Sequence, residues 1–141
     1  MKFLDSWAFK AERVSKVYIE HKGEVYVGIA KCHPDDEWSE FTGCKFAELR
    51  AMKEALKAQY KEEKLKLDAI KTFITAVGQY KNFDGESSTA KAMYRQYNRR
   101  VKQLEEIASD IAAIDDVIKA RLKSLEVIEG KRKNTEESKK S

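Results

Sequence analysis

Residues 78–102, GQYKNFDGESSTAKAMYRQYNRRVK, decide how the second half of this chain is organised. The segment from Asn82 to Ser88 is rich in glycine and short polar residues, which favour turns and helix caps over helix interiors. Long helical patterns lie on both sides of it, so the sequence predicts two helices joined by this turn. Ser87 or Ser88 is the expected N-cap of the second helix, because a serine hydroxyl accepts a hydrogen bond from a first-turn amide.

The same stretch carries the excess positive charge of the chain. It contains six lysines and arginines and two acids, a net charge of +4 that equals the net charge of the whole chain. Helical spacing places several of the cations on one side of the second helix near its N-terminal end, where free amides and the helix dipole favour an anion. Phe83 in the turn, with Tyr80 before it and Tyr94 and Tyr97 after it, offers flat surfaces on which a base can stack.

These residue types together fit a phosphate with an adenine-like ring. The predicted ligand-binding residues are Phe83, Lys91, Arg95, Asn98, Arg99 and Arg100. The alternative is that the arginines form only a solvated face, and that Tyr94 and Tyr97 belong to the core.

On both sides of the turn, apolar residues recur at steps of three, four and seven. This pattern predicts helices over about 43–79 and 89–128, with a gap in the first apolar stripe at Lys61–Lys64. Gly130 is expected to end the second helix and to leave residues 129–141 as a disordered charged tail. Each helix would be roughly 50 Å long, and stripes of that length predict an antiparallel hairpin that also packs against a second copy. A monomeric hairpin folded over the sheet is the alternative.

The first part of the chain predicts a small sheet. Residues 17–30, VYIEHKGEVYVGIA, are typical of a β-hairpin. We expect a three-residue loop His21–Gly23 with Gly23 in the left-handed conformation, because that register puts the apolar residues on one face. Those residues are Val17, Ile19, Val25, Val27 and Ile29. Residues 1–16 fit either a first strand or a helix, with alternation from Trp7 favouring the strand.

The predicted fold class is therefore α+β. A β-hairpin or three-stranded antiparallel sheet over residues 7–31 precedes a long two-helix antiparallel hairpin, in a single domain of residues 1–128. No apolar run approaches the roughly 20 residues of a membrane span, and residues 1–16 lack the apolar segment of a signal peptide. We expect a cytoplasmic protein with no membrane partner, in which Cys32 and Cys44 are free thiols.

Catalytic and metal-binding chemistry has no good candidate in the sequence. The set Cys32, His33, Asp35, Asp36 and Cys44 lacks the paired spacing of zinc ligands, so no metal and no cofactor are expected. Adjacent carboxylates such as Asp115 and Asp116 lie about 100° apart around a helix and do not form an acid–base pair. We therefore predict no catalytic residues, and a protein that is not an enzyme.

One family resemblance adds a functional expectation. The segment KVYIEHKGEVYVGIAKCHPDDEWSEFTGCKFAELRA (residues 16–51), followed by two helices joined at Phe83, resembles small phage proteins of the Thoeris anti-defence sponge family. The resemblance covers most of residues 16–128. It implies a sheet before two helices, assembly of copies through those helices, and Phe83 stacking on adenine. It also implies that the protein sequesters cyclic ADP-ribose signals, or cyclic oligonucleotides, without hydrolysing them, and so blocks antiphage defence in the infected bacterial host.

Two other function classes remain open. The basic cluster, with Lys131, Arg132 and Lys133, also suits a protein that binds nucleic acid or inhibits a nucleic-acid enzyme. The hairpin followed by FAELRAMKEAL resembles the end of a double-stranded-RNA-binding fold, but only Lys45 stands where that fold carries lysine pairs. The third possibility is a helical structural adaptor that has no ligand.

Overall fold

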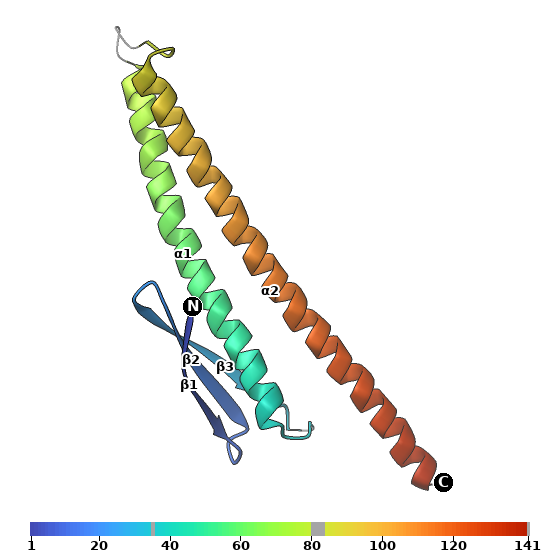
Figure 1. Cartoon of the computed structure of the whole chain (residues 1–141). Coiled ribbons are helices and arrows are strands. Elements are labelled where there is room, and N and C mark those ends of the chain that lie inside the picture. The colour runs from blue at the N-terminus through green and yellow to red at the C-terminus, as the bar shows by residue number, and fades with distance from the viewer. Residues whose placement is uncertain (35, 80–83, 141) are drawn as a thin grey trace. The chain divides into compact units, whose positions relative to one another are not determined.

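The chain has an α+β fold, as the sequence predicts. A computed structural model describes residues 1–34, 36–79 and 84–140, with side chains described through residue 123. The elements in order are β1 (Lys2–Phe9), β2 (Val14–His21), β3 (Glu24–Lys31), α1 (Glu40–Gly78) and α2 (Ser88–Lys140) (Figure 1). Residues 1–16 thus contribute a strand and not a helix.

The chain divides into two compact units. The first, here called the sheet unit, comprises Met1–Ala55 and Ala112–Ser141, and the second, the hairpin unit, comprises Leu56–Ile111. The sequence predicted one domain over residues 1–128. No helix in the described part of the chain is long and apolar enough to cross a membrane.

The turn between β2 and β3 differs from the prediction by one residue. Lys22 and Gly23 both have positive φ, 53° and 81°, and His21 pairs with Glu24, so the connection is a two-residue turn. The left-handed Gly23 is confirmed, but the three-residue loop is wrong. Because side chains alternate across a strand, a shift of one residue moves a whole set to the other face. Val25, Val27 and Ile29 therefore lie on the face opposite Val17 and Ile19, where they are exposed.

Gly28 explains why the sheet takes this register. It pairs with Val17 on the face that α1 covers, and a Cβ atom placed on it would overlap the carbonyl oxygen of Ala47 and lie 2.5 Å from the amide nitrogen of Ala51. Helix and sheet approach so closely at this point that only glycine fits at position 28. The prediction placed Val27 on this face beside Val17, where α1 leaves no room for a side chain.

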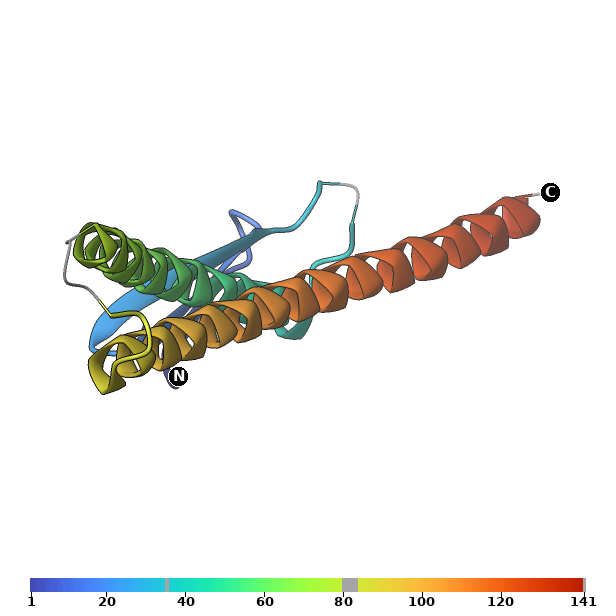
Figure 2. The same cartoon turned by 90° about the horizontal axis from the view of Figure 1, so that it is seen from above.

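The core of the sheet unit lies between the sheet and the first part of α1, which run beside each other in Figure 1 and Figure 2. Val17 and Ile19 are only 1% and 2% exposed, and Phe46 packs with them. Alanines of this core, which make the close approach possible, are Ala30, Ala47, Ala51 and Ala55. Ile118 of α2 packs against the same core. An ion pair also joins α1 to α2 here, with Lys53 Nζ 2.5 Å from Asp115 Oδ1.

The hairpin unit consists of the second part of α1 and the first part of α2, which lie side by side and antiparallel in both views (Figures 1 and 2). Leu56, Leu104 and Ile107 are buried, at 9%, 8% and 7% exposed, so the predicted apolar stripes do face inward. The structure fills the gap predicted at Lys61–Lys64 with Glu63, whose side chain is only 14% exposed.

The helix bounds differ from the predicted ones at two ends. α1 begins at Glu40, because the Ser39 hydroxyl accepts a hydrogen bond from the amide of Thr42 at 3.2 Å and caps the helix. α2 extends to Lys140 and so includes Gly130, where the sequence predicted its end. A glycine inside a helix costs only about 1 kcal/mol, and the lysines and glutamates that follow favour helix.

Candidate functional site

The start of α2 is fixed by two side-chain caps. The Asp84 carboxylate accepts a hydrogen bond from the amide of Glu86 at 2.9 Å, and the Ser87 hydroxyl accepts one from the amide of Ala90 at 3.2 Å. Ser87 is therefore the N-cap, one of the two residues predicted for that role. The cap uses one first-turn amide, so an anion bound near this end would depend mainly on side chains.

Most of the predicted cations lie on one side of α2, which we call the basic face. Its members are Lys91, Arg95, Asn98, Arg99 and Lys102, and all are exposed. At 3.6 residues per turn these positions fall within an arc of about 100°, and they extend over about 16 Å of helix. The basic face thus places cations and an amide side by side along the first turns of α2.

The contacts that these side chains make within the chain are weak. Lys91 Nζ lies 3.7 Å from the carboxylate of Glu86, and both side chains are well exposed, at 61% and 88%. Arg95 Nε donates to the carbonyl of Lys91 at 3.4 Å, close to the limit for a hydrogen bond. Exposed ion pairs contribute little free energy, so an anionic ligand competes easily with both contacts.

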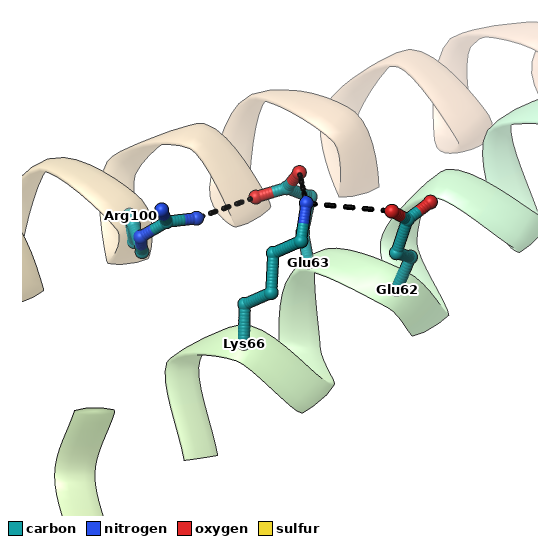
Figure 3. Close-up of polar contacts among 4 residues, drawn as sticks. All are labelled: Glu62, Glu63, Lys66 and Arg100. Carbon is teal, nitrogen blue, oxygen red and sulfur yellow. Dashed lines mark hydrogen bonds and ion pairs between the residues drawn. The ribbon is translucent and has the colours of Figure 1, made fainter. Parts of the chain in front are cut away.

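Arg100 does not belong to the basic face. It lies about 180° around α2 from Lys91. Arg100 Nη1 lies 3.3 Å from Glu63 Oε2, with the two side chains 28% and 14% exposed. Glu63 also lies 3.7 Å from Lys66 Nζ, which in turn lies 3.3 Å from Glu62 (Figure 3). The sequence grouped Arg100 with the ligand-binding cations, but in the structure its charge joins the two helices.

The aromatic partner of the site is only partly described. Phe83, the residue predicted to stack on a base, lies outside the described residues. Tyr97 is half-buried, as expected for a residue that faces the other helix, but Tyr94 is 45% exposed. Tyr94 precedes Asn98 by one turn and therefore flanks the basic face. The sequence left Tyr94 undecided between core and ligand site, and its exposure makes it available for stacking.

The sheet unit contains a cavity of about 140 Å³, which has different chemistry. Its lining includes Ser15, Cys32, Trp38, Phe46, Arg50 and Leu122. The Ser15 hydroxyl is buried without a hydrogen-bond partner among the described residues, and Arg50 Nη1 donates to the carbonyl of Ile29 at 2.9 Å. The lining residues include two bases, Lys31 and Arg50, and two acids, Asp36 and Glu37, so the formal charges balance and the cavity does not favour phosphate.

The two cysteines of the chain lie in the sheet unit. Cys32 and Cys44 are free thiols, and Cys32 Sγ accepts a hydrogen bond from Arg13 at 3.2 Å. Within the described ranges, no group of three or more histidine, cysteine and acidic side chains is placed to hold a metal ion. The exposed cations gathered on the basic face make it the candidate site for an anion.

Comparison with known proteins adds no relative, because no family model, curated protein or solved structure matches this chain. The resemblance to the Thoeris anti-defence sponge family therefore stays a hypothesis, which rests on the residues quoted from the sequence.

Proposed function

We propose that this protein binds the phosphates of a cyclic nucleotide signal on the basic face of α2 and holds the ligand without cleaving it. The observation that carries the proposal is the exposure of Lys91, Arg95, Arg99 and Lys102 on one face, with only weak contacts to the described residues of the chain. Such a ligand is of the cyclic ADP-ribose type or a cyclic oligonucleotide, as the family resemblance implies. Lowering the free concentration of the signal would block a host antiphage defence.

Each member of the basic face has a separate role in this proposal. A guanidinium group grips phosphate through two parallel hydrogen bonds, so Arg95 and Arg99 provide the strongest contacts. Asn98 adds an uncharged donor, and Tyr94 offers its ring to the base. One helix face gives a ligand only one wall, so enclosing a nucleotide requires another element of the chain or of a second copy.

Loss of either arginine should weaken binding without affecting the fold. The first step is a thermal-shift screen of cyclic ADP-ribose variants and cyclic oligonucleotides, since a ligand specific for the folded state raises its stability. Calorimetry with the best ligand should then show a loss of about 1–3 kcal/mol for Arg95→Ala and for Arg99→Ala. Arg95→Lys should restore little, because a point charge does not reproduce the planar grip.

Arg121→Ala is the matched control, because Arg121 is an exposed arginine of the same helix outside the basic face. Its affinity should equal that of the unmodified chain. Unchanged affinity in both Arg95→Ala and Arg99→Ala would move the site elsewhere. Ligand released by heating should have its original mass, and a cleaved ligand would show an enzyme instead of a sponge.

A second function, nucleic-acid binding, is favoured by the linear arrangement of the same cations along an outward-facing helix surface. A row about 16 Å long can follow a phosphate backbone. Binding of this kind weakens steeply with salt, with a slope of about −0.7 to −0.9 in log K per phosphate contacted. A small cyclic nucleotide with few phosphates should give a shallow slope. If no nucleotide and no nucleic acid stabilises the protein, a structural adaptor becomes the better description.

A further inference from the structure

The face of the sheet that points away from α1 is apolar and exposed, and we call it the open sheet face. Val25, Trp7 and Ile29 on this face are 60%, 51% and 42% exposed. The ring of Trp7 lies 6.0 Å from that of Phe9 and 6.3 Å from that of Tyr18 in edge-on contacts, which joins the three into one aromatic cluster. Contiguous apolar surface of this kind marks an interface with another macromolecule.

Charged residues divide the open sheet face into two halves. Cross-strand partners share a face, so the pairing places Lys16 between Trp7 and Ile29, and Lys31 opposite Val14, towards one end of the strands. Towards the other end, Asp5 pairs with Tyr18, and Glu20 pairs with Val25 on one side and with Lys2 on the other. One half of the face is therefore basic and the other half is mainly acidic, with apolar side chains in both.

We infer that a second copy of this chain docks on the open sheet face and forms a two-layer sandwich with a two-fold axis that crosses the strands. In this orientation the basic half of one sheet lies over the acidic half of the other. Lys31 then approaches Glu20 of the second copy, and Lys16 approaches Asp5. A two-fold axis parallel to the strands would instead stack Lys16 on its own copy, and the two like charges would repel.

The size of the open sheet face suits a dimer of modest affinity. Strands of eight residues, three abreast, cover roughly 26 by 14 Å, a footprint of about 370 Å² per copy. Accessible surface exceeds footprint because side chains protrude, so two copies approach the lower end of standard interfaces, about 1,200 Å² in total. We therefore expect a dissociation constant in the micromolar range.

Light scattering across protein concentrations from about 1 to 200 µM tests the dimer. The mass should rise from 16.3 kDa towards twice that value. Val27→Glu should raise the dissociation constant roughly a hundredfold or more, since it replaces an apolar contact of the sandwich by two carboxylates that must leave water. Val27 is 41% exposed in the single chain, so circular dichroism should show an intact fold.

Leu65→Glu is the matched control, because Leu65 is a 64% exposed apolar residue of the hairpin unit. The sandwich predicts that this variant dimerises normally. Dimerisation lost in Leu65→Glu and kept in Val27→Glu would overturn the inference in favour of a helix interface. An unmodified chain that stays at 16.3 kDa at 200 µM would overturn it too.

A charge exchange tests the orientation of the two copies. Glu20→Lys and Lys31→Glu should each weaken the homodimer, because each brings like charges together at both symmetry-related contacts. Mixing the two variants in equal amounts restores both opposite-charge pairs, and the mixture should regain the dimer mass. If both variants are folded and their mixture stays monomeric, the proposed orientation is wrong.

Discussion

Gly28→Ala should destabilise the protein, although alanine is normally the better residue in a strand. The added Cβ overlaps the carbonyl oxygen of Ala47 and lies 2.8 Å from its carbonyl carbon. These are backbone atoms of α1, so no side-chain rotation relieves the contact, and the helix must move off the sheet. Overpacking typically costs 1–3 kcal/mol, and we expect about 3 kcal/mol here.

Alanine loses less conformational entropy than glycine on folding, which stabilises the variant by about 0.5–1 kcal/mol. The net loss in the free energy of unfolding is therefore about 2 kcal/mol. For a chain of this size each kcal/mol shifts Tm by roughly 3–4 °C, so Tm should fall by about 7 °C in a calorimetric or circular dichroism melt. Gly78→Ala is the control, because no described residue lies within 4 Å of its added Cβ, and its Tm should stay the same or rise. A Tm for Gly28→Ala within 2 °C of wild type would refute the close approach of α1 to the sheet.

Two further substitutions test buried polar groups by urea unfolding. Ser15→Ala should leave stability unchanged or raise it by about 1 kcal/mol, because no described residue forms a hydrogen bond with the buried Ser15 hydroxyl, and a loss above about 1 kcal/mol would show an unrecognised bond. Glu63→Leu should lower stability by about 1–3 kcal/mol by leaving Arg100 half-buried without its carboxylate, and adding Arg100→Leu should restore most of the loss. Failure of the double variant to recover would show that the pair does not set the packing of the hairpin unit.

The element order could be predicted from the sequence, but the hairpin register could not. Alternation of β-branched and aromatic residues identifies β2 and β3, and Gly23 identifies their turn. The register was predicted by placing the largest apolar residues in the core. In the structure the choice depends on the helix that packs on the sheet, because Gly28 must face Ala47 and Ala51. That contact joins residues distant in sequence, and no local pattern of either segment reveals it.

The candidate site could likewise be predicted from the sequence only in part. Spacing along a single helix correctly places Lys91, Arg95 and Arg99 on one exposed face. It also contains the information that separates Arg100, which lies four residues before the buried Leu104 and follows the inward stripe. The sequence interpretation grouped Arg100 by charge alone. An ion pair between two helices is indicated when one helix has an acid at an inward position and the other has a base at an inward position.

The structure also changes where a second copy is expected to bind. Assembly through the helices was predicted because apolar stripes of this length need a cover; Leu104, Ile107 and Ile114 of the stripe are buried within the chain itself, at 7–9% exposed, whereas Leu122 is 43% exposed. The shift of one residue in β3 has the opposite effect, because it moves Val25 and Val27 from the core to the open sheet face. Exposed apolar area is what drives association. The same close packing that requires glycine at position 28 therefore creates the surface on which we expect a second copy to dock.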